Sequence, residues 1–100
     1  LDITGNVRST STMTATNFIL SSDIRLKDNI TKAKVLDLPE IKEFTFKSDK
    51  TNRNRFGVIA QELEKVSPDM VHKDKNGMLS VDYTDFSLAK IVELENKIKN

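Results

Sequence analysis

The chain of 100 residues has room for one small domain, and its 16 basic and 15 acidic residues leave a net charge of only +1. A balance of this kind provides no overall field that would attract the chain to nucleic acid or to an anionic membrane. It has no cysteine and a single histidine, His72, which excludes disulfides, thiolate metal sites and a multi-histidine metal site within one chain. We therefore expect no metal, no cofactor, no nucleic acid and no membrane partner.

The first twenty residues are rich in serine and threonine and differ in composition from the rest of the chain. Thr, Val, Ile and Phe favour extended backbone, and the alternation around Ile3 with a turn at residues 4–6 predicts two short strands. The segment has too little apolar surface to fold alone. We expect it to continue a fibrous β structure of a longer parent chain, shared among chains; a disordered linker is the alternative.

From Ser22 onward the composition becomes charged and mixed. A helical turn is expected at residues 32–38, before Pro39, and then a strand in which Phe44 and Phe46 point to one side. A short apolar strand is expected at residues 56–60, where Gly57 indicates a close backbone approach. It is followed by a short helix at residues 61–67, which ends at Pro68.

The last third of the chain predicts a hairpin and a helix. Asn76-Gly77 is the strongest short hairpin signal, with flanking strands at residues 70–72 and 79–81. A helix is expected over residues 84–100, with Thr84 or Asp85 as its N-cap. The elements together predict a small mixed α+β domain with short antiparallel strands that ends in a long C-terminal helix.

The final helix has two apolar rows. Ile91, Leu94 and Ile98 follow the 3-4 spacing of one helical face, and Leu88 and Val92 form a second row beside it. One row could pack on the domain and the other on partner helices, as in a coiled coil. The alternative is a terminal amphipathic helix that covers its own sheet.

Ser22 precedes Lys27 by five residues, and this pair could be catalytic or structural. A serine hydroxyl is a poor nucleophile unless a base takes its proton, and a lysine serves as that base only if burial lowers its pKa well below about 10.4. Five residues do not align two side chains on one ideal helix, but a turn between them allows contact. The alternative is a Ser-Asp cap beside a solvated lysine, and spacing alone favours it.

Other chemistry is sparse. His72 is expected to be a surface or half-buried strand residue, and Glu62 and Glu64 form no obvious acid–base pair. The chain has no glycine-rich phosphate loop. Its lysines and arginines are interspersed with acids, which argues against a nucleic-acid groove.

Three ordered blocks of residues carry a family resemblance. They are Ser22-Asp23-Arg25-Lys27-Asn29-Ile30, then Gly57-Ile59-Ala60-Gln61-Glu62, then Gly77-Val81-Tyr83. Over residues 21–100 the chain resembles the C-terminal intramolecular chaperone domain of phage tail spikes, tail fibres and endosialidases, which also occurs in myelin-regulatory-factor-type transcription factors. Residues 30–44 are shorter than the family pattern and the last helix ends early, so we expect a reduced first helix and an incomplete trimeric stalk.

The resemblance implies a homotrimer that brings three parent chains into register, helps a slow-folding β fibre or spike to form, and then cuts itself off. Residues 1–21 would be the end of the parent fibre, and residues 22–100 the chaperone and self-cleaving domain. The implied scissile bond joins Ser21 to Ser22. The implied roles are nucleophile for Ser22, general base and proton shuttle for Lys27, and orienting or supporting groups for Asp23, Arg25, Asn29, Gln61 and Glu62.

The implied partners are further copies of the chain and the parent fibre or spike segment. The implied setting is a virion tail precursor that folds in the host cytoplasm and releases its chaperone part after cleavage. Two alternatives remain: a trimerisation or capping module that never cuts, and a receptor-binding tip. The second would need an exposed recognition patch, and aromatic residues make up only 6% of the chain.

Overall fold

The computed structural model describes residues 2–99 and divides the chain into two units, Leu1–Thr31 and Lys32–Asn100. Leu1 and Asn100, which begin the expected fibre segment and end the expected last helix, lie outside the described residues. This division into two units follows the contacts that the backbone makes within each unit. The functional boundary expected before Ser22 is defined by a scissile bond instead, and it stays a prediction.

In the first unit, the described residues form one short 3-10 turn, η1 (Ile24–Leu26), and no strand. Every side chain from residue 2 to residue 31 is exposed. The prediction of two short strands in the first twenty residues is therefore wrong for this chain. Strands of this length need a partner sheet or an apolar surface to pack on, and the unit offers neither.

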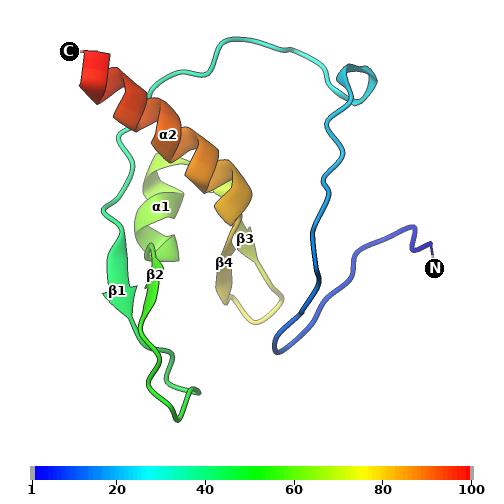
Figure 1. Cartoon of the computed structure of the whole chain (residues 1–100), viewed down its shortest axis with the longest axis vertical. Coiled ribbons are helices and arrows are strands. Elements are labelled where there is room, and N and C mark those ends of the chain that lie inside the picture. Colours follow the sequence, from blue (N-terminus) through cyan, green and yellow to red (C-terminus); the bar gives the residue numbers. More distant parts are fainter. Residues whose placement is uncertain (1, 100) are drawn as a thin grey trace. The chain divides into compact units, whose positions relative to one another are not determined.

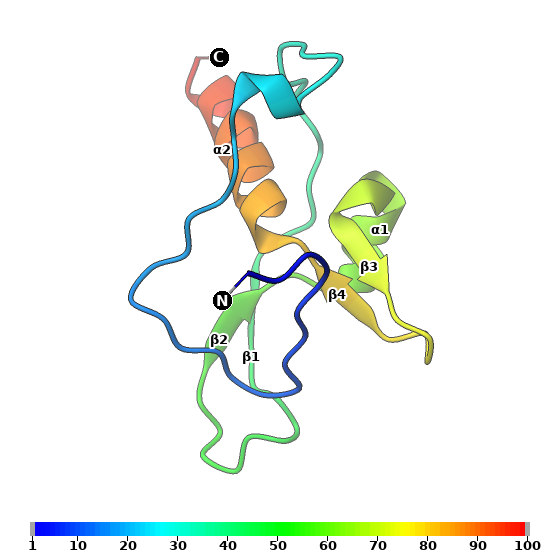
Figure 2. The same cartoon turned by 90° about the vertical axis from the view of Figure 1, so that its right-hand side faces the viewer.

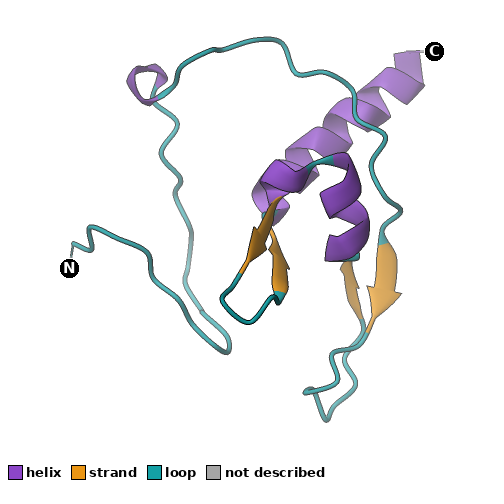
Figure 3. Ribbon diagram, turned by 180° about the vertical axis from the view of Figure 1, so that it is seen from behind, coloured by secondary structure: helices purple, strands orange, loops and turns teal. Residues whose placement is uncertain are grey.

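The second unit contains two helices and two antiparallel strand pairs (Figure 1). Strand β1 (Lys42–Phe44) pairs with β2 (Arg55–Gly57), and β3 (Val71–Lys73) pairs with β4 (Leu79–Val81). The helices are α1 (Ala60–Val66) and α2 (Tyr83–Lys99), and the 3-10 turn η2 (Pro68–Met70) links α1 to β3 (Figure 3). This arrangement confirms the predicted small α+β fold with a C-terminal helix.

The first strand pair is shorter than expected. Phe44 and Phe46 lie on the same side, with ring centroids 5.0 Å apart in an edge-to-face arrangement, as their alternation predicted. Strand β2 ends at Gly57, and α1 begins at Ala60. The strand expected over residues 56–60 therefore begins one residue earlier and is three residues long, and Val58 and Ile59 link it to the helix.

The second hairpin confirms the Asn-Gly signal, with Val71 opposite Val81. Its loop depends on Asp74, whose carboxylate accepts hydrogen bonds from the backbone N–H groups of Asn76 (2.8 Å) and Met78 (3.0 Å). Gly77 adopts a φ of 82°, which glycine reaches without steric cost. The hairpin lies against α1 (Figure 2), so this local turn also places β4 beside the helix.

Residues 31–41 contain no helix, so the helical turn expected at residues 32–38 is wrong. Leu38 is buried in the core, and its backbone N–H donates to the Glu93 carboxylate of α2 over 2.8 Å. A helical turn would withdraw that N–H into an intrahelical bond. Contact with α2 therefore overrides the local preference, and the segment runs extended along the helix.

The core of the second unit is small and joins four segments far apart in the sequence. Leu38 comes from the extended segment, Val58 from the junction after β2, Leu63 from α1 and Phe86 from α2. Leu63 is fully buried. Such a limited core is what a domain of this size is expected to bury.

Helix α2 begins at Tyr83, two residues before one of its expected caps. The capping contact comes from Asp82, whose carboxylate accepts the backbone N–H of Asp85 over 3.1 Å, so the prediction of Thr84 or Asp85 as N-cap is wrong. The helix buries Phe86 and Glu93, while Ile91, Leu94 and Ile98 are exposed. None of the helices within residues 2–99 combines the length and the apolar character needed to cross a membrane.

Candidate functional site

The residues around Ser22 are organised by the short turn η1. Asp23 is its N-cap, and the Asp23 carboxylate accepts the backbone N–H of Arg25 over 2.9 Å. The backbone N–H groups of Leu26 and Lys27 donate to the carbonyls of Asp23 (3.0 Å) and Ile24 (3.1 Å). The chain therefore closes one tight turn between Ser22 and Lys27.

The cap is reinforced by a fork-shaped ion pair within the turn. The Arg25 guanidinium donates to both carboxylate oxygens of Asp23, from Nε over 3.1 Å and from Nη2 over 2.9 Å. These bonds, followed by the backbone N–H of Arg25, hold the pKa of Asp23 below its usual range. Both side chains are exposed, so the pair contributes geometry to the turn more than stability.

The turn brings the two residues of the expected dyad into contact. Lys27 Nζ lies 2.7 Å from Ser22 Oγ and donates a hydrogen bond to it. A general base acts across the same pair of atoms with the proton moving the other way, from the hydroxyl to a neutral amine. Both side chains are exposed to solvent in the single chain. The geometry thus meets the proximity that the chemistry needs, and exclusion of water is the condition that remains.

The other expected site residues are distributed over both units. Asn29 lies in the first unit with a φ of 54°, a left-handed conformation that Asn tolerates better than most residues and that bends the chain after Lys27. Gln61 and Glu62 lie in the first turn of α1 in the second unit, where Glu62 accepts a hydrogen bond from Lys42 over 3.4 Å. Their support of the dyad stays a prediction.

The second and third motif blocks meet at Gly57 and Tyr83. The Tyr83 hydroxyl accepts the backbone N–H of Val58 over 3.0 Å, and a Cβ atom on Gly57 would collide with this hydroxyl and lie 3.0 Å from Cε1 of Phe44. This confirms the close backbone approach predicted at Gly57. The glycine and the tyrosine of the two blocks thus have a structural reason for their residue types.

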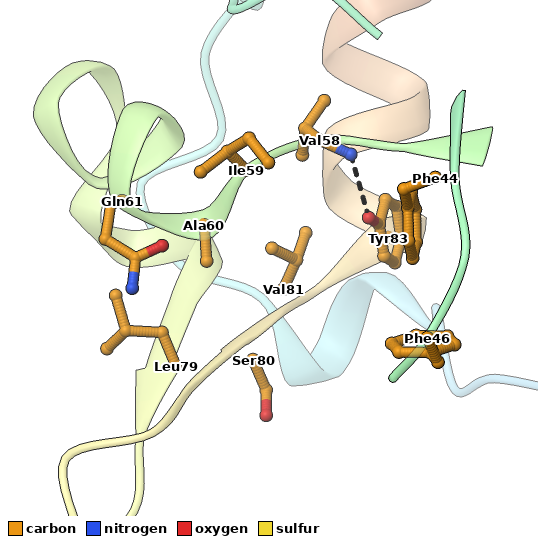
Figure 4. A pocket seen from close by; sticks show the side chains of 10 residues that line it. All are labelled: Phe44, Phe46, Val58, Ile59, Ala60, Gln61, Leu79, Ser80, Val81 and Tyr83. Atoms are coloured by element: carbon orange, nitrogen blue, oxygen red, sulfur yellow. Dashed lines mark hydrogen bonds between the residues drawn. The ribbon is translucent and has the colours of Figure 1, made fainter. Parts of the chain in front are cut away.

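Sequence reasoning missed two features of the second unit. One is the buried carboxylate of Glu93, which binds the N–H of Leu38 and lies 2.8 Å from Lys90 Nζ. The only signal in the sequence was an acidic residue next to the apolar row of α2. The other is a cavity of about 500 Å³ beside Tyr83 (Figure 4). It is formed by segments distant in the sequence, which no local pattern reveals.

No group of three or more His, Asp or Glu side chains within residues 2–99 is arranged to hold a metal ion. The contact between Lys27 Nζ and Ser22 Oγ lies within the first of the three motif blocks.

Comparison with known proteins gives one match. The family model described as "Chaperone of endosialidase" (Peptidase_S74) matches residues 22–72, which is just over half of the chain and begins at Ser22. No curated protein and no solved structure matches the chain. The match includes η1, both strands of the first pair, α1 and η2, and it ends within β3. The chain belongs to the chaperone of endosialidase family.

Proposed function

We propose that the chain is an intramolecular chaperone that trimerises, assists the folding of a phage tail fibre or spike, and then releases itself by cutting the bond between Ser21 and Ser22. Family membership supports the chaperone role and the tail context. The observation that carries the cleavage step is the 2.7 Å contact between Lys27 Nζ and Ser22 Oγ, at the residue where the family match begins.

The proposed reaction has two steps. Neutral Lys27 takes the Ser22 hydroxyl proton, and Oγ attacks the carbonyl carbon of Ser21. The C–N bond of the peptide breaks as Lys27 returns the proton to the Ser22 amine, which leaves Ser21 attached through an ester. Water then hydrolyses the ester, so that Ser21 gains a carboxylate and Ser22 regains its hydroxyl.

The base is active only when the amine is neutral. An amine in water carries a proton at neutral pH, and withdrawal from water favours its neutral form. Since both members of the dyad are exposed in the single chain, assembly is the event proposed to cover them. Cleavage would then follow correct trimerisation without a separate sensor, and each chain would react once.

The exposed row of α2 supports the trimerisation step. Ile91, Leu94 and Ile98 face solvent, while another face of the helix buries Phe86 and Glu93. An apolar row of this spacing is the seam that coiled-coil partners bury. Release from the fibre would also remove the route by which the fibre folded, which makes the fibre's stability kinetic.

The test is the mass of freshly made protein under denaturing conditions. We expect wild type to break between Ser21 and Ser22, whereas Ser22→Ala and Lys27→Met stay intact, a loss of at least about 100-fold in cleavage rate. Ser21→Ala is the matched control and should still cut. Full cleavage of Lys27→Met would contradict the dyad. An intact wild-type trimer would instead favour the permanent capping module.

A further inference from the structure

The cavity beside Tyr83 has the character of a binding site for an apolar peptide. It is open to solvent, has a volume of about 500 Å³ and lies between β1, the junction of β2 with α1, and β4 (Figure 4). This volume falls within the range of about 300–1,000 Å³ typical of ligand pockets. No Asp, Glu, Lys, Arg or His lines it. Most of the lining is apolar: Phe44, Phe46, Val58, Ile59, Leu79 and Val81.

A few polar groups accompany this apolar surface. Gln61, Ser80 and Tyr83 also line the cavity, and each can exchange hydrogen bonds with the backbone of a bound peptide. Figure 4 shows the Gln61 side chain projecting toward Leu79. A surface of apolar pockets with neutral hydrogen-bonding groups suits an extended peptide without charges.

The chain itself contains such a peptide just before the proposed scissile bond. Residues 18–20 are Phe-Ile-Leu, and their side chains are 64%, 89% and 64% exposed. No charged residue occurs between Arg8 and Asp23, so the whole segment is neutral. No side chain from residue 2 to residue 31 is buried, which leaves these three apolar groups without packing inside their own unit.

The connection is long enough for the same chain to supply the peptide. Lys32 borders a small cavity with Val92 and Asn96 near the end of α2, whereas Tyr83 of the large cavity begins that helix. Thirteen residues of helix separate Tyr83 from Asn96, or about 20 Å. The twelve steps from Leu20 to Lys32, even with η1 included, reach about 35–40 Å.

We propose that this cavity binds residues 18–20 of the same chain before cleavage. The inference rests on the proposed function and identifies the piece of the parent that the chaperone holds. Docking would bury the apolar side chains of the parent's end and fix the chain immediately ahead of Ser21. The short tether gives the peptide an effective concentration in the millimolar range, so a weak intrinsic affinity is sufficient.

The absence of cysteine in the chain allows a direct test in the full-length protein. Ser80 lines the cavity and is exposed, so Ser80→Cys is a nearly isosteric change that should not disturb folding. It is combined with Ile19→Cys in an uncleavable Ser22→Ala background. The matched control pairs Ser80→Cys with Ile3→Cys, another exposed isoleucine of the first unit.

We expect the Ile19→Cys pair to form an intrachain disulfide at least about tenfold faster than the control, since docking holds the two thiols at bonding distance. Equal rates in the two pairs would overturn the proposal. A disulfide between chains, visible as a dimer on a non-reducing gel, would also overturn it and assign the cavity to a second copy. Because Ser22→Ala removes cleavage, the result is independent of whether wild type cuts.

Discussion

At the residue scale, Gly57 shows how the absence of a side chain allows two parts of the fold to come into contact. The Tyr83 hydroxyl occupies the space where a Cβ would stand and accepts the backbone N–H of Val58 over 3.0 Å. The N–H that follows β2 is therefore satisfied by the first residue of α2. The contact ties the strand pair to the helix through a single hydrogen bond.

Gly57→Ala should lower the free energy of unfolding by about 1–3 kcal/mol, because the methyl group collides with the Tyr83 hydroxyl in a packed region. Thermal unfolding measures this as a lower Tm. Gly5→Ala is the control, since nothing lies within 4 Å of its new methyl group. Adding Tyr83→Phe removes the colliding oxygen, so the two changes should cost less together than their sum.

Glu93 is a second residue whose position decides the path of the backbone. Its side chain is 5% exposed, and it accepts the N–H of Leu38 over 2.8 Å. Lys90 Nζ lies 2.8 Å from the other carboxylate oxygen and Lys97 Nζ lies 3.8 Å from it. Removing the carboxylate would leave the buried Leu38 N–H and two cations without this partner.

Glu93→Ala should therefore lower the free energy of unfolding by about 1–3 kcal/mol, and Glu93→Gln by less, because an amide oxygen can still accept the Leu38 N–H. Glu95→Ala, on the exposed side of the helix, should change it by no more than about 0.5 kcal/mol. Chemical denaturation of the three variants gives the comparison. Equal effects of Glu93→Ala and Glu95→Ala would contradict this role.

The same carboxylate makes stability depend on pH. Lys90 first, and then the Leu38 N–H, hold the pKa of Glu93 below its ordinary value of 4.5. The unfolded chain thus binds this proton more readily than the folded one, and the stabilisation is complete above about pH 4.5 and lost as pH falls through the lower folded value. The stability difference between wild type and Glu93→Gln should shrink over that acid range.

At the scale of elements, the turn η1 converts a five-residue spacing into a side-chain contact. Asp23 closes the turn by accepting from both the backbone and the guanidinium of Arg25. With the turn closed, Lys27 Nζ lies 2.7 Å from Ser22 Oγ. Asp23 is thus a positioning residue in the proposed reaction, since it acts through the backbone that carries the dyad.

Asp23→Ala should slow self-cleavage by about 2–30-fold, because loss of the capping carboxylate opens the turn. Asp23→Asn keeps a capping oxygen and should lose less. Asp28→Ala, an exposed acid just after the dyad, is the control. Quantitative gels of the precursor over time provide the rates, and an unchanged rate in Asp23→Ala would separate the turn from the chemistry.

Elements with local signals were predictable from the sequence, and those set by distant contacts were not. Pro68 and Asn76-Gly77 mark the end of α1 and the second hairpin, and both occur within a residue or two of the expected positions. The helical turn predicted at residues 32–38 does not form, because the Leu38 N–H donates a hydrogen bond to Glu93, 55 residues away. In the candidate site, the contact between Ser22 and Lys27 and the Ser-Asp cap were both anticipated from the sequence, whereas the forked ion pair of Arg25 with Asp23 was not.

At the scale of the whole molecule, the proposal links assembly to cleavage through the exposed row of α2. Ile91→Asp should abolish trimerisation, because a charged side chain opposes burial in the seam. The cleavage rate should then fall at least about tenfold, since each 1.4 kcal/mol lost from the free energy of assembly lowers the assembly constant tenfold. Light scattering gives the oligomeric state, and denaturing gels give the cleavage. Glu95→Gln is the control on the same helix.

A monomeric Ile91→Asp protein that cuts at the wild-type rate would break the link between assembly and the base, while leaving the dyad itself intact. A trimeric variant that cuts normally would show instead that the seam lies elsewhere. The two results address different parts of the proposal.

The neutral segment ahead of Ser22 affects how readily newly made chains aggregate. Residues 16–21, Thr-Asn-Phe-Ile-Leu-Ser, form a six-residue window of β-prone composition with neither charge nor proline, and its apolar members are exposed. Windows of this type nucleate cross-β aggregation when they stay uncovered. The nearest gatekeeping charges are Arg8, eight positions before the window, and Asp23, two positions after it. Aggregation of newly made chains would therefore compete with the proposed docking of residues 18–20 and with the proposed trimerisation, and the soluble yield should fall when synthesis is faster than assembly.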